Sequence, residues 1–323
     1  MKIPFFLTTL FVLCICACTP DTKSGPELWC DQQLRPELAE LESVSVSSNW
    51  FKVYRVGEGV FAIMEPYNFQ EVISFLILGD NKALLFDTGM GLEPISPVIQ
   101  QLTDLPVMVV NSHSHYDHIG GNYEFDNVIA RNTLAMKERV KRGAPHEQVR
   151  GEVTPAALCL DKLTNLDTAA YAIKPFDVSY YFTEIADFSL PLGGRDIKVL
   201  FVPGHSPDAV ALYDEDNGYL WTGDTFYEAP IWLFHNGTNL TAYRNSIELL
   251  AGLSGNLNKV FPAHNLPVAS PARLNELVTA FDQVVSGEKK AAADSENPEV
   301  STFEFEHFSF VIRSKLLDGY QNP

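Results

Sequence analysis

The sequence predicts an α/β (α+β) protein in which sheets pack against helices. Between residues 50 and 86, short apolar runs with strand-like patterns follow one another across tight turns. Beyond residue 87, strand-like and helix-like segments alternate, which is typical of layered folds. Metal-binding side chains directly follow several of the expected strands. The chain has 323 residues, of which 46% are apolar, enough to bury a sizeable core.

The first half of the chain contains five expected strands and one expected helix. Residues 51–56 alternate apolar and polar side chains, the pattern of a half-buried strand. The other strands of this half are expected at 60–63, 72–78, 83–86 and 107–110. A helix is expected at 94–103. Asp87 follows the fourth strand, and a histidine-rich run follows the fifth.

The second half shows a similar order of elements. Strands are expected at 188–190, 197–202, 209–213, 219–221 and 260–264. Helices are expected at 241–253 and 271–285. The final alternation, at 302–312, slips in phase near His307, so we expect a bulged terminal strand that closes the sheet.

Residues 131–186 interrupt this order. Segments 132–142 and 155–163 look helical, and an aromatic-rich stretch follows them. We interpret 131–186 as a helical insertion in a domain that spans residues 50–313, with 314–323 as a C-terminal tail. The insertion either forms one wall of a substrate pocket or is a pair of packing helices, and loop-length considerations favour neither interpretation.

The first residues have the pattern of an export signal. Lys2 precedes a nearly unbroken apolar run that is too short to cross a bilayer as a stable helix. The sequence Ile15-Cys16-Ala17-Cys18 resembles a bacterial lipobox, in which a small residue precedes the cysteine that becomes lipidated. This resemblance implies that residues 1–17 are a signal peptide and that Cys18 carries the lipid. Cys16 fits less well, because Ile15 precedes it.

The implied mature protein is a lipoprotein. It would be secreted across the bacterial inner membrane and lipid-anchored in the periplasm or cell envelope through Cys18, with residues 18–49 as a polar tether. An ordinary signal peptide and an uncleaved membrane anchor are the alternatives. Cys30 and Cys159 lie far apart in the sequence and nothing in their spacing indicates that they pair, so a disulfide is not predicted.

The charge balance narrows the class of partner. The formal net charge is −18, from 23 basic and 41 acidic side chains. Nucleic-acid binding depends on lysine and arginine neutralising phosphates, so a nucleic-acid partner is disfavoured. We expect a small-molecule substrate. The sequence does not indicate an oligomeric state.

The run from His113 to His118 is the strongest chemical signal in the chain. Within six positions it holds His113, His115, Asp117 and His118, although the whole chain has only 8 histidines. Imidazole and carboxylate groups are the ligands that zinc and related cations prefer. The run follows an expected buried strand, where a rigid scaffold commonly places catalytic groups. The sequence therefore predicts a metal site here rather than a chance cluster.

Polar residues follow other expected strands as well. In chain order the set is Asp87, the His113–His118 run, His205, Asp224 and His264. This pattern resembles the metallo-β-lactamase fold superfamily, and the resemblance covers residues 50 to about 270. It implies a four-layer αβ/βα sandwich with the site at the edge between two β-sheets.

Residue by residue, the resemblance implies two metal sites. It assigns the first metal to His113, His115 and His205, and the second to Asp117, His118 and His264. Asp224 would bridge the two metals, and Asp87 would orient ligands through hydrogen bonds. The implied cofactor is Zn²⁺, two ions per chain, with iron or manganese as alternatives. The remaining histidines, interpreted as surface or packing residues, are His146, His235 and His307.

The resemblance also implies a reaction: a dinuclear zinc-dependent hydrolase that uses a metal-bound hydroxide to cleave an ester, thioester or lactone. Asp117 would also hold the hydroxide's proton and pass it to the leaving group. His115 stands where oxygen-reducing di-iron relatives have glutamate, and Asp224 stands where zinc β-lactamases have cysteine or lack a bridging acid. The implied relatives are glyoxalase II, lactonases and acyl-CoA thioesterases. A β-lactamase, a mononuclear-iron persulfide dioxygenase and a non-catalytic metal-binding protein remain alternatives.

The stretch after Asp224 is rich in aromatic residues. We expect Tyr227 to donate a hydrogen bond to the developing oxyanion, and Trp232 and Phe234 to line an apolar pocket. Core packing is the alternative for these aromatic side chains. Arg244 is the one basic residue expected near the site, and such a scarcity of cations weakens the acyl-CoA version of the hypothesis.

Overall fold

A computed structural model describes residue 30 and residues 34–183, 188–292 and 299–320. The expected signal peptide and Cys18 lie outside the described residues. The described strands form three sheets of eight, five and three strands. No helix among the described residues is long and apolar enough to cross a membrane.

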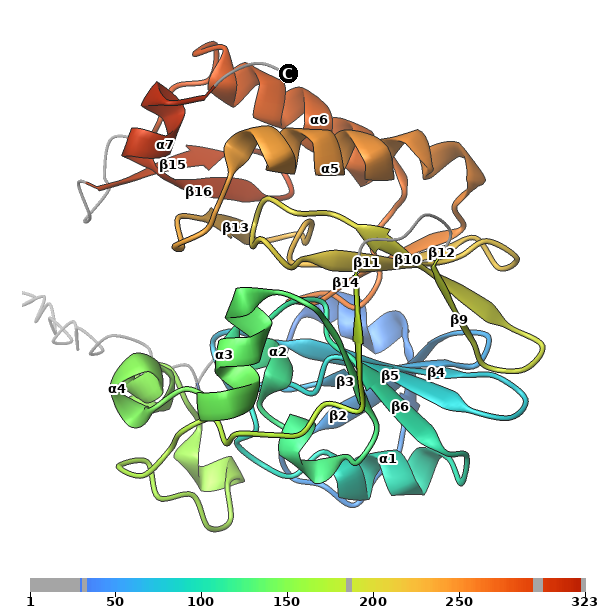
Figure 1. Cartoon of the computed structure of the whole chain (residues 1–323). Coiled ribbons are helices and arrows are strands. Elements are labelled where there is room, and N and C mark those ends of the chain that lie inside the picture. The colour runs from blue at the N-terminus through green and yellow to red at the C-terminus, as the bar shows by residue number, and fades with distance from the viewer. Residues whose placement is uncertain (1–29, 31–33, 184–187, 293–298, 321–323) are drawn as a thin grey trace, which may run out of the picture.

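The eight-stranded sheet has its strands in chain order (Figure 1). They are β1 (Glu42–Val44), β2 (Lys52–Gly57), β3 (Val60–Met64), β4 (Ile73–Leu78), β5 (Ala83–Phe86), β6 (Val107–Val110), β7 (Val128–Arg131) and β8 (Tyr180–Phe182). Strands β1 to β5 pair antiparallel, whereas β5 to β8 pair parallel, with helix α1 (Ser96–Leu102) connecting β5 and β6. Phe86 pairs with Val110, so β5 and β6 end at one edge of the sheet. The residues after both strands therefore lie close together.

The five-stranded sheet has the order β14-β12-β11-β10-β9. Its strands are β9 (Ser189–Pro191), β10 (Asp196–Phe201), β11 (Val210–Asp214), β12 (Tyr219–Gly223) and β14 (Lys259–Pro262). Because β12 and β14 run parallel, Asp224 and His264 emerge at the same edge. Gly223 has a φ of 52°, and a Cβ at this position would lie 2.7 Å from the Cβ of Ser112. Glycine therefore lets β12 end directly against the histidine-rich loop.

The remaining elements flank these sheets. The three-stranded sheet contains β13 (Pro230–Leu233), β15 (Val300–Glu304) and β16 (Ser309–Arg313). The longer helices of the second half are α5 (Leu240–Gly252) and α6 (Ala272–Val285), and α7 (Ser314–Asp318) follows β16. Short helices α2 (Tyr116–Ile119), α3 (Leu134–Arg142) and α4 (His146–Val149) lie in the first half of the chain.

The two larger sheets face each other across a shared apolar core. Phe75 of β4 contacts Phe261 of β14, with ring centroids 5.6 Å apart, and Phe86 and Trp221 belong to the same buried cluster. A second cluster lies between the eight-stranded sheet and α1, and a third packs under α5 and α6 (Figure 1). Helices thus cover the outer faces of two stacked sheets, which confirms the predicted fold class.

The structure corrects two expected elements. Residues 302–312 form a hairpin of β15 and β16 rather than a bulged strand, because the backbone N–H of Phe305 donates to the carbonyl of Phe308 and closes a turn at the phase slip. Residues 155–163 are not helical apart from a 3-10 turn at Leu160–Lys162. In that segment the N–H of Cys159 donates instead to the carbonyl of Tyr67, which fixes the chain against the sheet region.

The described part of the N-terminal segment packs onto the domain. A 3-10 helix (Pro36–Glu40) precedes β1, which pairs with β2. Cys30 forms a disulfide with Cys159, with 4.9 Å between their Cα atoms, a pairing that the sequence did not predict. The Arg35 guanidinium pairs with the Glu71 carboxylate. These contacts tie Cys30 and residues 34–44 to the first half of the domain.

Candidate metal centre

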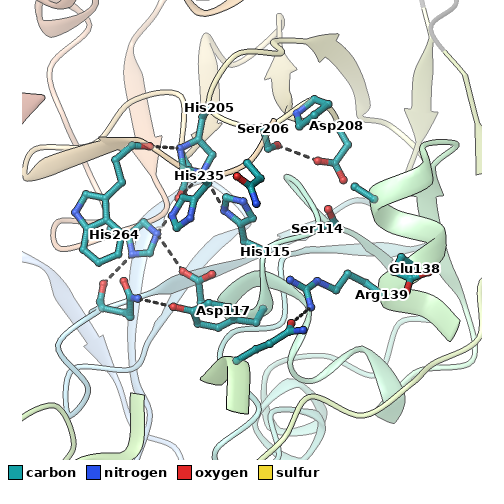
Figure 2. Close-up of a pocket in the computed structure, with 18 of the residues that line it drawn as sticks. Ser114, His115, Asp117, Glu138, Arg139, His205, Ser206, Asp208, His235 and His264 are labelled. Carbon is teal, nitrogen blue, oxygen red and sulfur yellow. Dashed lines mark hydrogen bonds and ion pairs between the residues drawn. The ribbon is translucent and has the colours of Figure 1, made fainter. Parts of the chain in front are cut away.

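The loops at the ends of five strands meet at one edge between the two facing sheets. Asp87 follows β5, His113 lies beyond β6, His205 beyond β10, Asp224 follows β12 and His264 lies beyond β14. In Figure 2, His115, Asp117, His205 and His264 project into a common cavity from different elements. The structure therefore brings together every metal-ligating residue that the sequence predicted.

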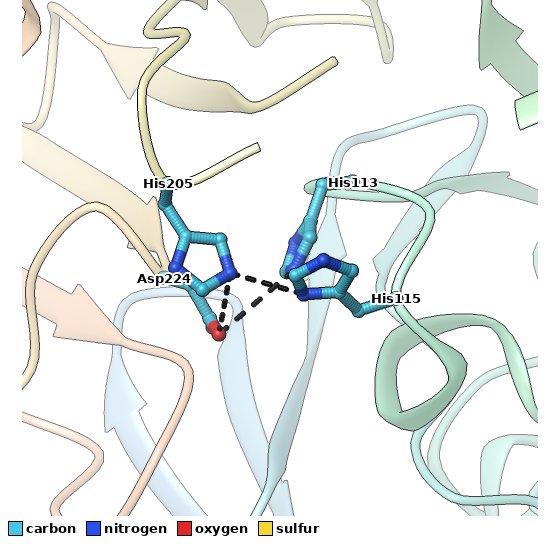
Figure 3. A group of neighbouring side chains, drawn as sticks. All are labelled: His113, His115, His205 and Asp224. Carbon is cyan, nitrogen blue, oxygen red and sulfur yellow. Dashed lines mark hydrogen bonds and ion pairs between the residues drawn. The ribbon is translucent and has the colours of Figure 1, made fainter. Parts of the chain in front are cut away.

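One group of side chains contains His113, His115, His205 and Asp224, whose potential ligand atoms all lie within 4.8 Å of one another (Figure 3). Nδ1 of His115 and Nε2 of His205 are 3.0 Å apart. Oδ2 of Asp224 lies 3.4 Å from Nε2 of His205 and 3.9 Å from Nε2 of His113. Three imidazole nitrogens and one carboxylate oxygen thus converge on one point.

A second group contains Asp117, His118 and His264, again with potential ligand atoms within 4.8 Å. The other oxygen of Asp224 faces this group: Oδ1 lies 3.1 Å from Nε2 of His264 and 3.2 Å from Nε2 of His118. Asp224 therefore directs one carboxylate oxygen to each group, which is the arrangement expected of a bridging ligand.

Hydrogen bonds on the far side of the rings fix the orientation of the histidines. A 2.8 Å hydrogen bond joins Nδ1 of His118 to Oδ2 of Asp87. Nδ1 of His205 donates to the carbonyl of Trp232 at 2.8 Å, and Nδ1 of His264 donates to the carbonyl of Gln70 at 2.7 Å. Since Nδ1 carries the proton in each case, Nε2 presents its lone pair to the cluster.

Asp87 is itself held firmly. It adopts a positive φ of 66°, which is uncommon for a residue other than glycine, and its Oδ1 accepts a 2.6 Å hydrogen bond from the backbone N–H of Ser112. Its carboxylate thus links the end of β5 to the histidine-rich loop and orients His118, as the sequence predicted.

The cluster meets the requirements of a site for two cations. The Nε2 atoms of His113 and His118 are buried without a hydrogen-bond partner among the described residues. Buried polar atoms are rarely left unsatisfied, and a metal ion accounts for both. Nitrogen and carboxylate oxygen donors suit zinc and similar divalent ions.

The electrostatics agree with metal binding. Burial and neighbouring imidazoles lower the pKa of His113 and His115 well below the usual value, so both rings are neutral. Burial alone would raise the pKa of Asp117, but His118 and His264 lower it to about 2. The pKa of Asp224 is lowered well below its usual range by the same neighbours, despite its burial. The same carboxylates raise the pKa of His118 and His264 despite their burial, so a cation that binds the second group would displace protons from these rings.

The cluster opens into a cavity of about 430 Å³. Tyr227 and Trp232 line it, in agreement with the sequence, whereas Phe234 is not among its lining residues and stacks beside Trp232, with centroids 5.5 Å apart. Arg244 does not reach the cavity, because it pairs with Asp282 and Glu248 on the helical face.

Several lining residues were not predicted from the sequence, among them Arg139 and His235, the latter in contrast to its interpretation as a surface or packing residue. The His235 ring lies 4.7 Å from that of His115, and Arg139 of α3 lines the cavity beside Ala135, Glu138 and Gln148 of the expected insertion. A histidine or arginine without a local motif gives no signal in a single sequence, since only the tertiary structure brings it to the site. His146 and His307 lie elsewhere: His146 bonds the carbonyl of Tyr171, and His307 lies beside Glu306.

The model of the Metallo-beta-lactamase superfamily matches residues 69–285, more than half of the chain. The chain belongs to this superfamily. It is 26% identical to human acyl-coenzyme A thioesterase MBLAC2 over 67% of this chain and 81% of that protein. It is 30% identical to a hydroxyacylglutathione hydrolase of Synechococcus sp. (strain JA-3-3Ab) over 44% of each chain. Together with the ligand groups, these findings identify a metal-dependent hydrolase of the metallo-beta-lactamase superfamily.

Solved structures of the superfamily share the fold. DIM-1 metallo-beta-lactamase superposes with a TM-score of 0.51 at 13% identity, over 75% of this chain and 100% of that chain. The sec-alkylsulfatase Pisa1 from Pseudomonas sp. superposes with a TM-score of 0.56 at 18% identity, over 73% of this chain and 42% of that chain. The chain thus spans less than half of the alkylsulfatase, and similarity at these identities concerns the fold alone.

Proposed function

We propose that this metallo-beta-lactamase superfamily member is a dinuclear, zinc-dependent hydrolase that cleaves an ester, thioester or lactone. The observation that carries the proposal is Asp224, which directs one oxygen to each of two adjacent ligand groups. The similarity to a thioesterase and to a hydroxyacylglutathione hydrolase, by their names, supports acyl-transfer chemistry to water.

Divalent cations bound at this site would supply Lewis acidity, which lowers the pKa of a coordinated water and polarises the scissile carbonyl. The protein's own carboxylate handles the proton. Asp117 lines the cavity, and its Oδ2 faces Nε2 of His118 at 3.4 Å and Nε2 of His264 at 3.7 Å. No ion pair or hydrogen bond described for Asp117 involves Oδ1, which leaves this oxygen to accept the proton of the attacking water and return it to the leaving group.

In this proposal Tyr227 binds the developing oxyanion. Its side chain lines the cavity, and its hydroxyl oxygen accepts a 3.3 Å hydrogen bond from the backbone N–H of Trp232. Burial and the nearby Asp224 raise the pKa of Tyr227 well above its usual value, so the hydroxyl keeps its proton. That proton is available to a negatively charged oxygen in the cavity.

We expect Tyr227→Phe to lower kcat by about 10²-fold with little change in KM, the effect of losing one oxyanion donor. Stopped or continuous assays on a p-nitrophenyl ester measure both constants, and a thermal melt verifies folding. Tyr180→Phe, at an exposed tyrosine of β8, serves as the matched control. An unchanged kcat in the folded Tyr227→Phe variant would remove Tyr227 from the mechanism.

A smaller cavity of about 140 Å³ adjoins the metal centre and takes the apolar part of the substrate in this proposal. It shares Gln70, Tyr227, Trp232 and His264 with the larger cavity. Phe69 and Trp232 face each other there, with ring centroids 6.4 Å apart. Aromatic walls next to a polar reaction centre are typical of small-molecule sites.

The substrate class is tested with a panel assayed on zinc-loaded protein: p-nitrophenyl esters, acyl-CoA, lactones and the β-lactam nitrocefin. We expect turnover of the esters, thioesters or lactones, and little of nitrocefin. Hydrolysis of nitrocefin alone would replace the proposal with a β-lactamase, and no turnover by protein that holds two metals per chain would favour a non-catalytic metal-binding protein.

A further inference from the structure

One basic side chain faces the metal-site cavity. Among the described residues that line it, Arg139 is the only lysine or arginine. Its side chain extends from α3 toward the part of the cavity where Asp117 lies (Figure 2). In a chain with a net charge of −18, an arginine at this place does not reflect a generally basic surface.

Arg139 is held on one side of its guanidinium. Nη1 donates to the carbonyl of Gly143 at 3.2 Å and to Oε1 of Gln148 at 2.9 Å, and both acceptors are neutral. Within the described residues, Nε and Nη2 have no hydrogen-bond acceptor and no carboxylate lies within ion-pair distance. Burial lowers the pKa of Arg139, in line with a charge that has no direct counter-ion.

Neither acidic residue on the same wall forms an ion pair with Arg139 among the described residues. Glu138 pairs with Arg142, one turn further along α3, at 3.0 Å. Asp208 accepts a 2.9 Å hydrogen bond from the Ser206 hydroxyl at Oδ1, and its buried Oδ2 has no hydrogen-bond partner, Arg139 included, among the described residues. The positive charge of Arg139 is therefore available to a ligand.

The free edge of Arg139 matches the shape of a carboxylate. Nε–H and Nη2–H project side by side from the planar guanidinium, and the two oxygens of a carboxylate accept both protons at once. The chain uses this edge elsewhere for the same purpose. Nε and Nη2 of Arg244 bind the two oxygens of Asp282, and the same atoms of Arg35 bind the Glu71 carboxylate.

We propose that Arg139 determines specificity by binding a carboxylate of the substrate, with the scissile bond at the Asp117–Asp224 centre. This inference rests on the proposed hydrolase function and narrows its substrate class to anionic esters or thioesters. The apolar pocket at Phe69 and Trp232 takes the acyl part. No residue of α3 lines that apolar pocket, so the carboxylate at Arg139 is assigned to the alcohol or thiol part.

The test compares 4-acetoxybenzoate with 4-acetoxybenzamide, which differ in the charge of the leaving group. We expect wild-type protein to have a higher kcat/KM for the benzoate than for the benzamide. Arg139→Gln should lower kcat/KM for the benzoate by about 10- to 100-fold, which corresponds to the free energy of the lost charge-assisted hydrogen bonds. The benzamide should be unaffected, and Arg139→Lys should restore part of the preference. Lys141→Gln, which removes the same charge from an exposed position of α3 without breaking a described ion pair, is the matched control and should alter neither rate.

If the ratio of kcat/KM for the benzoate to kcat/KM for the benzamide is the same in wild type and Arg139→Gln, the assignment of Arg139 is overturned. Turnover of the benzamide tests the hydrolase function separately. If neither ester is cleaved, calorimetric titration of the zinc-loaded protein replaces kinetics. The probes are 3-mercaptopropionate and 3-mercaptopropionamide, whose thiols bind zinc alike. Arg139→Gln should weaken only the carboxylate probe, by about 10-fold. Equal affinity of wild type and Arg139→Gln for 3-mercaptopropionate would refute the proposal.

Discussion

Asp224→Asn is expected to reduce metal binding at both sites and to lower hydrolysis by at least about 10³-fold, equivalent to several kcal/mol of lost Lewis-acid stabilisation. The reason is geometric. Oδ2 lies 3.4 Å from Nε2 of His205 and Oδ1 lies 3.1 Å from Nε2 of His264, so one substitution removes a charged ligand from each group. Metal content per chain after dialysis and kcat/KM for a p-nitrophenyl ester measure the two effects.

The control for this substitution is Asp216→Asn, which makes the same chemical change on the exposed turn between β11 and β12. It should retain close to two metals per chain and full activity. Metal-free wild type, prepared with a chelator, should match the inactivity of Asp224→Asn and regain activity with zinc. Two tightly bound metals in a folded Asp224→Asn protein would show that Asp224 does not bridge them.

Periodicity predicted most elements of the fold, because the buried faces of strands and helices repeat at fixed spacing. The strand before the histidine-rich loop, expected at 107–110, is observed as β6, and the helix expected at 271–285 is observed as α6. Local sequence patterns gave wrong predictions where contacts with distant parts of the chain determine the secondary structure. The segment 155–163 has apolar spacing suited to a helix, yet a disulfide at Cys159 and a backbone bond to Tyr67 hold it in turns.

The metal-ligating residues could be predicted because each follows a strand and a family motif contains it. The resemblance to the superfamily also implied the two groups whose potential ligand atoms the structure brings within 4.8 Å. Two other residues that line the cavity could not be found in this way. Arg139 and His235 lie in segments without a motif, and only the packing of α3 and of the segment after β13 against the cluster brings them to the cavity. The candidate metal ligands thus carry a local sequence signal, whereas Arg139 and His235 are brought to the cavity by the tertiary structure alone.

Asp117→Asn is the second substitution with a large expected effect, and it separates proton handling from metal binding. Asp117 belongs to the second ligand group alone, so the first group, with His113, His115 and His205, remains intact. The variant is expected to keep at least one metal per chain and its folded structure. Its kcat should fall by about 10³-fold or more, because an amide cannot accept the proton that the carboxylate transfers.

Three measurements distinguish this role from simple damage. Metal analysis should show more bound metal in Asp117→Asn than in Asp224→Asn, and thermal melts of the zinc-loaded proteins should place Asp117→Asn closer to wild type. Asp216→Asn again serves as the matched control. Substitution by glutamate should recover part of the activity, since Asp117→Glu keeps a carboxylate near His118 and His264. Full activity of a folded Asp117→Asn protein would exclude Asp117 as the proton carrier and assign that step to another group in the cavity.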